Sequence, residues 1–327
     1  MRISVERSAL LKATSRAQGV VERRTTIPIL ANILIEAEGG SAALRATDLD
    51  IEIHEVAPAM VEQAGAVTVP AHTLHEIVRK LPDGAQVTLA DEPGTGRLRA
   101  TAGRYKSDLP TLPREDFPAM ASSEYDVTYT APAAVLRRLF EKSAFAISTE
   151  ETRYYLNGVY LHVAEKDGAK RLRAVATDGH RLACIDAAAP EGVETAPDVI
   201  VPSKTVGELR KLLEDDDAEV TVSVSPTKIR FEAGDIALTS KVIDGSFPDY
   251  TRVIPYQNDR RMETDAADFA KAVDRVATVS AERSRAVKLA LEEDRLTLTV
   301  NSPDAGSATE EVTVAYGDAP LEIGFNA

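Results

Sequence analysis

An internal repeat with a period of about 130 residues is the feature that most constrains how this chain can fold. Three short segments recur in the same order: Ala46-Thr47-Asp48 as Ala176-Thr177-Asp178, Val69-Pro70 as Val201-Pro202, and Phe117-Pro118 as Phe247-Pro248. Their common order and spacing indicate a duplicated unit. A chain of 327 residues is also too long for one ordinary hydrophobic core. We therefore expect three tandem domains, at residues 1–126, 127–256 and 257–327.

Each copy follows one plan of helix, strands, helix and strands. The copies open with apolar residues at helical spacing, such as Leu10, Ala13, Ala17 and Val20 in the first and Leu136, Leu139 and Phe140 in the second. A second helix follows each Val-Pro step. Short alternating runs such as Leu296-Thr297-Leu298-Thr299-Val300 are typical of antiparallel strands. The pattern predicts an α+β fold in which two helices per copy cover one face of antiparallel sheets.

The third copy is shorter than the other two. Residues 321–327 match the strand that precedes the second helix in the earlier copies, so that Ala327 aligns with Ala71 and Ser203. The repeat then predicts an incomplete third copy that lacks roughly 50 residues at its C-terminal side.

Composition restricts the compartment and the chemistry. No apolar run approaches the roughly 20 residues that a membrane helix needs, and the N-terminus lacks the apolar core of a secretory signal. The single Cys184 can form neither an internal disulfide nor a cysteine-based metal site. We expect a cytoplasmic protein with no membrane association and no metal or other cofactor.

The charges are unevenly distributed. Residues 6–24, 71–81, 132–143 and 203–213, which cover the predicted helices of the first two copies, carry 13 basic and 5 acidic residues in a chain whose net charge is -14. Because the basic residues fall between the apolar positions, we expect them on the exposed helix faces. Such faces attract phosphates without reading bases. Ordinary solvated helices with mixed charge explain the counts equally well.

Few residues suggest catalysis. Asp178 and His180 could form a catalytic pair, which leaves a nucleic-acid hydrolase as the alternative function. His72 and His75 lack an evident third metal ligand, and Pro93-Gly94-Thr95-Gly96-Arg97 lacks the Gly-Lys-Ser/Thr of a phosphate loop. Structural roles are the more common explanation for such residues, so we expect no catalytic residue.

Several longer segments resemble one family. They are Ile27-Pro28-Ile29-Leu30-Ala31-Asn32, Arg153-Tyr154-Tyr155-Leu156-Asn157-Gly158, Ala174-Val175-Ala176-Thr177-Asp178-Gly179-His180-Arg181-Leu182-Ala183, Phe247-Pro248-Asp249-Tyr250 and Glu322-Ile323-Gly324-Phe325-Asn326. Together they resemble the beta subunit of bacterial DNA polymerase III, the sliding-clamp family. The resemblance implies a non-enzymatic processivity factor, a homodimeric ring with sheets outside and helices inside, that encircles duplex DNA without sequence specificity.

The family also has a pocket for short linear peptides of replicative and repair polymerases and of the clamp loader. The matching positions here are Arg153, Leu156, Thr177, Gly179, His180, Arg181, Leu182, Pro248 and Val253. The aliphatic members and the proline would supply an apolar floor and the charged ones a polar rim. Asn326 would contribute to a neighbouring subsite.

Two further sets of residues follow from the resemblance and the charge pattern. For DNA contact these are Arg24, Arg79, Arg137, Lys204 and Arg252. Glu150, which stands where the family carries glutamine, would repel phosphate. For ring closure, Arg104, Lys106 and Leu109 of one subunit would face Val279, Glu310 and Glu311 of the other, with complementary charge.

Overall fold

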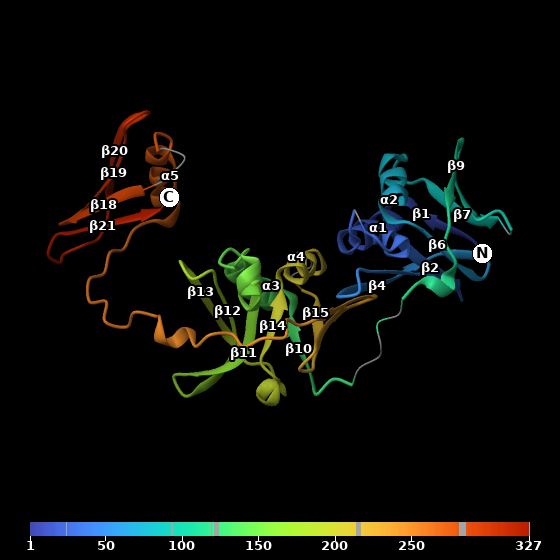
Figure 1. Ribbon diagram of the computed structural model, residues 1–327, viewed down its shortest axis with the longest axis horizontal. Helices are drawn as coiled ribbons and strands as arrows, with labels where there is room; N and C mark the ends of the chain where they lie inside the picture. The colour runs from blue at the N-terminus through green and yellow to red at the C-terminus, as the bar shows by residue number, and fades with distance from the viewer. Residues whose placement is uncertain are drawn as a thin grey trace. The chain divides into compact units, whose positions relative to one another are not determined.

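The computed structural model describes residues 1–23, 25–92, 94–118, 120, 124–213, 217–280 and 286–326. The chain divides into two compact units, Met1–Phe247 and Pro248–Ala327. The first unit contains two copies of the repeat and the second contains the third copy (Figure 1).

Apart from β5, which has no counterpart among the described strands of the second copy, the first two copies share one order of helices and strands. The predicted α+β plan of tandem domains is confirmed. The first copy consists of β1 (Arg2–Glu6), α1 (Arg7–Val20), β2 (Asn32–Glu38), β3 (Ser41–Thr47), β4 (Ile51–Pro58), β5 (Met60–Gln63), β6 (Gly65–Pro70), α2 (Ala71–Lys80), β7 (Gln86–Glu92), β8 (Arg97–Ala102) and β9 (Tyr105–Pro110). The second consists of β10 (Val127–Pro132), α3 (Ala133–Ala144), β11 (Gly158–Lys166), β12 (Ala169–Thr177), β13 (Leu182–Ala188), β14 (Val199–Pro202), α4 (Ser203–Leu212), β15 (Glu219–Val224), β16 (Lys228–Ala233) and β17 (Ile236–Lys241).

The described strands of the first unit form three antiparallel sheets. One sheet has the order β5-β1-β7-β8-β9 and another β13-β12-β11-β14. The third has eight strands in the order β10-β15-β16-β17-β4-β3-β2-β6. It crosses the boundary between the copies where β17 pairs with β4 and Leu238 lies opposite Ile53. Backbone hydrogen bonds therefore join the two copies directly.

The helices bury the apolar residues that the spacing predicted. Leu10 and Val20 of α1 and Leu136 and Phe140 of α3 are all buried. The helices α1 and α4 lie beside each other across the copy boundary (Figure 1). A side chain at Gly19 would collide with the Glu208 carboxylate, so this glycine permits the close approach of the two helices.

The expectation that the basic helix residues lie on exposed faces is wrong for two arginines of α1. The side chains of Arg7 and Arg16 are only 14% and 19% exposed. Arg7 donates to the carbonyls of Val78 and Arg79 at 3.2 and 2.8 Å, and Arg16 donates to the buried Glu55 at 2.8 Å. The carbonyls at the end of α2 need donors, and Arg7 is long enough to provide them.

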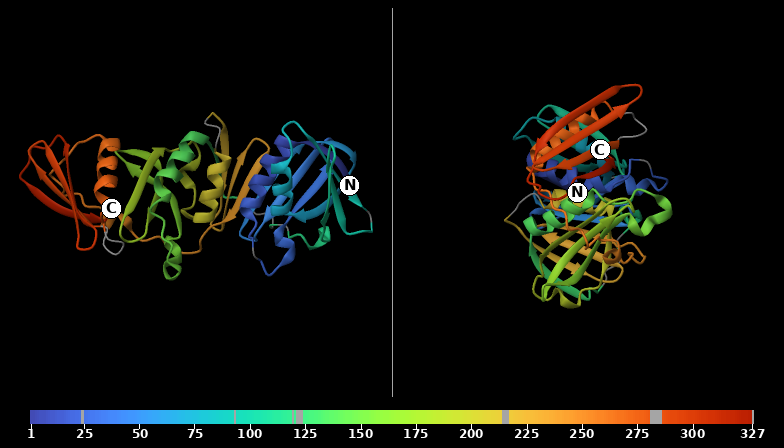
Figure 2. Two further views of the ribbon diagram at one scale, coloured as in Figure 1. Left: turned by 90° about the horizontal axis from the view of Figure 1, so that it is seen from above. Right: turned by 90° about the vertical axis from the view of Figure 1, so that its left-hand side faces the viewer.

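The second unit contains the short helix η5 (Tyr250–Arg252), the helix α5 (Ala266–Ala277) and the strands β18 (Ala286–Glu292), β19 (Arg295–Ser302), β20 (Gly306–Thr313) and β21 (Leu321–Asn326). The strands form one sheet in the order β20-β19-β18-β21, on which α5 packs (Figure 2). The Asp265 carboxylate accepts two amides of the first turn and caps α5. No helix in the described ranges is long and apolar enough to cross a membrane.

Candidate functional site

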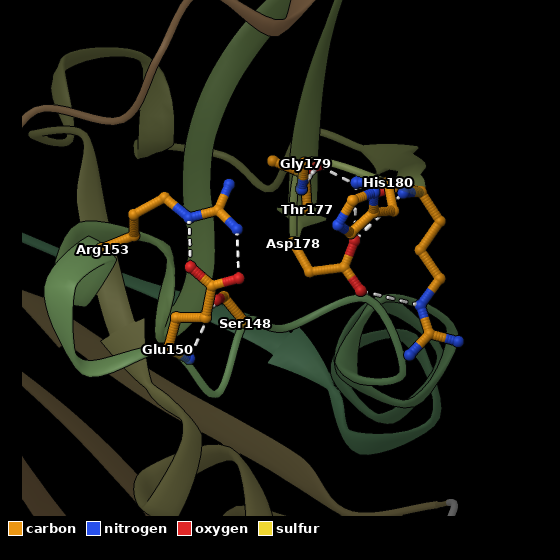
Figure 3. Close-up of polar contacts among 8 residues, drawn as sticks. Ser148, Glu150, Arg153, Thr177, Asp178, Gly179 and His180 are labelled. Carbon is orange, nitrogen blue, oxygen red and sulfur yellow. Dashed lines mark hydrogen bonds and ion pairs between the residues drawn. The ribbon is translucent and has the colours of Figure 1, made fainter. Parts of the chain in front are cut away.

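A tight turn between β12 and β13 forms the centre of the candidate site. The Thr177 hydroxyl donates to the Arg181 carbonyl at 2.7 Å and accepts the Gly179 N–H at 3.1 Å. The Asp178 carboxylate accepts the N–H groups of His180 and Arg181 at 2.9 and 3.0 Å. Gly179 has a φ of 88°, which favours glycine. His180 and Arg181, at the tip of the turn, are both exposed; Figure 3 shows Thr177, Asp178, Gly179 and His180 of this turn.

The same turn occurs in the first copy and explains why the Thr-Asp pair recurs. The Thr47 hydroxyl donates to the Ile51 carbonyl at 2.9 Å, and the Asp48 carboxylate accepts the N–H groups of Asp50 and Ile51 at 2.9 and 2.8 Å. Leu49 occupies the position of Gly179 with a φ of 82°. Both copies thus use the same hydrogen-bonded turn to connect two neighbouring strands, β3 to β4 in the first copy and β12 to β13 in the second.

The first-copy turn has an additional partner. The Lys204 ammonium of α4 bonds the second oxygen of Asp48 and donates to the Val20 carbonyl at 2.8 Å. Lys204, predicted to contact DNA, therefore links the two copies, and any phosphate contact would compete with these bonds.

Arg153 lies against the β12–β13 turn. Its Nε and Nη2 donate to the Glu150 carboxylate at 2.8 and 2.5 Å (Figure 3). A Cβ atom at Gly179 would lie 2.6 Å from Arg153 Nη1. These hydrogen bonds lower the pKa of Glu150 and raise the pKa of Arg153. Glu150, which we expected to repel DNA, is thus paired with an arginine.

The Asp178 carboxylate stabilises the turn by accepting backbone N–H groups. Burial acts to raise its pKa, but hydrogen bonds from the His180 and Arg181 amides and from Arg181 Nε at 3.1 Å outweigh burial, and the pKa lies below its ordinary value. Within the described part of the chain, the carboxylate bonds the His180 backbone and has no hydrogen bond to its imidazole. This arrangement does not activate a histidine base.

The remaining predicted pocket residues differ in exposure. Leu156 ends the short helix η3 (Glu151–Leu156) and is only 4% exposed, whereas Leu182 at the start of β13 is half-buried. Pro248 and Val253 belong to the second unit and are exposed. Sequence reasoning missed Phe145, which is 57% exposed and whose ring centroid lies 5.6 Å from the Arg181 guanidinium carbon. The available signal was a phenylalanine just past the predicted end of a helix.

The predicted DNA contacts occupy different environments. Arg24 lies outside the described residues. The Arg79 side chain is 57% exposed and bonds Glu76 at 2.8 Å. Arg137 is half-buried and donates to the Leu213 carbonyl at 3.2 Å. Arg252, in η5, is exposed.

The predicted interface residues lie at or near two sheet edges. Arg104 directly precedes the edge strand β9 and Lys106 lies in it, and both residues are exposed. Leu109 of β9 is buried within its own domain. Glu310 and Glu311 are on the edge strand β20, where Glu310 accepts Arg275 Nε at 2.9 Å and Glu311 lies 3.7 Å from Arg295. Val279 is half-buried shortly after α5.

The histidines noted in the sequence have protein partners. His72 lies 3.2 Å from the Gln18 side-chain oxygen, and the buried His75 lies 3.3 Å from the Thr14 hydroxyl. The described residues contain no group of three or more His, Cys, Asp or Glu side chains that could hold a metal ion.

Comparison with known families identifies the chain. Three family models of the DNA polymerase III beta subunit match this chain. The model of the N-terminal domain matches residues 1–121, that of the central domain residues 130–249 and that of the C-terminal domain residues 251–327. The chain belongs to the DNA polymerase III beta subunit family. The family consists of sliding clamps, which are not enzymes, so the hydrolase alternative is wrong.

Individual relatives support the assignment. The beta sliding clamp of Caulobacter vibrioides is 56% identical over 327 residues, which are 100% of this chain and 88% of the relative. That of Escherichia coli K12 is 38% identical and is 87% covered. Crystal structures of clamps from Bartonella birtlesii and Pseudomonas aeruginosa, both bound to griselimycin, match all of this chain and 87% of their own, with TM-scores of 0.95 and 0.92 at 50% and 37% identity.

Proposed function

We propose that this clamp closes as a homodimer around duplex DNA and tethers replicative and repair polymerases and the clamp loader through short linear peptides. The observation that carries the proposal is the tandem repeat, whose first two copies are fused through the β17–β4 pairing. Repeated domains joined edge to edge build an extended wall. Such a wall can surround a duplex without reading its sequence.

Weak contacts suit this role. Arg79 is exposed, and its pair with Glu76 is a surface pair that salt screens. A phosphate can replace such a partner at little cost, which allows contacts to form and break as the clamp slides. Retention then comes from encirclement. A primer-extension assay on circular template tests this function: the full-length clamp with its loader should lengthen the products, and unchanged product length would refute the proposal.

We place peptide docking at the β12–β13 turn. His180 and Arg181 are exposed polar groups, and Arg153 is held beside them. This arrangement offers donors for a peptide backbone next to the aliphatic side chain of Leu182. Titration of a labelled peptide with leucine and phenylalanine anchors should show weaker binding to His180→Ala and unchanged binding to the control His54→Ala on β4. Equal affinity of His180→Ala and the unsubstituted chain would contradict this placement.

We propose that subunits join through the edge strands β9 and β20. The side chains of Arg104 and Lys106 have no hydrogen-bond or ion-pair partner among the described residues, so they are free to meet carboxylates of another subunit. Reversing both charges (Arg104→Glu with Lys106→Glu) should convert a dimer into a monomer in sedimentation experiments on the full-length protein. An unchanged dimer would exclude this interface.

A further inference from the structure

A groove in the first unit lies outside the peptide-docking turn and shares only Arg181 with it. Its volume is 620 Å³, and it runs between the end of α3 and one face of α4. The residues that line it are Ala144, Phe145, Ile147, Ser148, Thr149, Asn157, Arg181, Ser203, Val206, Gly207 and Arg210. This volume suits a small organic ligand.

Two arginines stand at the groove with unused donors. Arg181 bonds Asp178 through Nε at 3.1 Å, and Arg210 bonds Glu141 through Nε at 3.3 Å. In the described part of the chain, no hydrogen-bond partner is found for the Nη groups of either arginine. The side chains are 59% and 56% exposed. The carboxylates therefore hold each guanidinium by one edge and leave its outer nitrogens available for an anion.

The walls of the groove combine apolar and polar groups. Phe145 is 57% exposed and offers apolar surface, and its ring already lies against a cation, Arg181. Asn157 Oδ1 is buried and has no hydrogen-bond partner among the described residues. A buried acceptor without a donor is costly. A ligand with an N–H group on an apolar ring would satisfy both the acceptor and the apolar surface.

Gly207 adds an independent observation. It is exposed in the middle of the ten-residue helix α4, where glycine weakens the helix. A Cβ atom at this position would meet nothing within 4 Å in the described structure, so packing against the chain does not require glycine. The missing side chain keeps the groove open beside the helix backbone.

From these features we infer that the groove binds one unpaired nucleotide. The base would lie on Phe145 and donate an N–H to Asn157, and the phosphate would bond the outer nitrogens of Arg181 and Arg210. Every DNA base carries an N–H donor and an apolar face. This ligand could be a free nucleotide or a nucleotide in single-stranded DNA. The inference goes beyond duplex encirclement and does not depend on it.

The test measures fluorescence anisotropy of a labelled oligothymidylate with the whole chain at low salt. Gly207→Leu fills the groove without changing charge, and Arg210→Gln removes one phosphate contact; neither residue belongs to the peptide-docking turn. Each should weaken binding at least about fivefold, as expected for one lost stacking or charge contact, while the control Arg97→Gln on β8 should bind normally. Arg210→Gln should also reduce the dependence of log Kd on log salt by about 0.7.

Competition identifies the source of the nucleotide. Displacement by thymidine monophosphate assigns the groove to a single nucleotide, and displacement by unlabelled oligothymidylate alone assigns it to a DNA strand. The inference is overturned if the unsubstituted chain does not bind the oligonucleotide. It is also overturned if Gly207→Leu binds like the unsubstituted chain, or if duplex competes as well as the single strand. Circular dichroism confirms that each variant is folded.

Discussion

Gly179→Ala tests whether the β12–β13 turn positions Arg153. The residue has a φ of 88°, where a side chain costs about 1–2 kcal/mol. The lower entropy of unfolded alanine offsets about 0.4–1 kcal/mol. The net loss of unfolding free energy should be about 1 kcal/mol, or about 2–4 °C in the melting temperature of a unit of this size. The new Cβ would also lie 2.6 Å from Arg153 Nη1, so the guanidinium must move.

Two measurements separate these effects. Denaturant titration reports the loss of stability, and peptide titration reports the displacement of Arg153, which should weaken binding. Leu49→Gly is the matched control, because Leu49 holds the equivalent place in the first copy with a φ of 82°. Relief of strain and the greater entropy of unfolded glycine nearly cancel there, so its stability should change by less than about 0.5 kcal/mol. The reasoning fails if Gly179→Ala leaves both stability and peptide affinity unchanged.

Two further substitutions probe ion pairs of the first unit. Lys204→Met removes the partner of Asp48, whose side chain is only 11% exposed, and should lower the free energy of unfolding by about 1–3 kcal/mol in a denaturant titration. The control is Lys12→Met, which replaces an exposed lysine of α1. If Lys204→Met lowers the free energy of unfolding no more than the control does, the link between the copies is contradicted. Asp186→Asn should cost about 1–2 kcal/mol at neutral pH, because the Arg173 guanidinium holds the Asp186 pKa below its usual 3.8. A depressed carboxylate pKa stabilises above the unfolded value and loses this contribution as pH falls. The difference between the two proteins should therefore shrink below about pH 4, and a difference independent of pH would exclude the ion pair as its cause.

Much of the fold could be predicted because the repeat and the apolar spacing are local signals. The buried faces of α1 and α3 coincide with the predicted positions, such as Leu10 and Leu136. The fusion of the copies through β17 and β4 could not be predicted, because pairing between residues as distant as Leu238 and Ile53 leaves no local pattern.

The candidate site was predictable to a similar degree. The repeated Thr-Asp pair marks one turn in both copies, and the resemblance pointed to His180 and Arg181. Charge partners were not predictable, because long side chains bond whatever tertiary structure brings near them. Arg16 turns inward to Glu55, and Lys204 reaches Asp48 from a distant segment.

The central claim, that this clamp holds DNA by encircling it, is tested by loading full-length protein onto nicked circular DNA with its clamp loader. The bound protein is then counted after gel filtration in high salt, before and after the circle is cut once. Salt removes phosphate contacts but not a closed ring. We predict that the protein stays on the circle and is lost after linearisation. Equal retention on circular and linear DNA, or loss from both in high salt, would contradict encirclement.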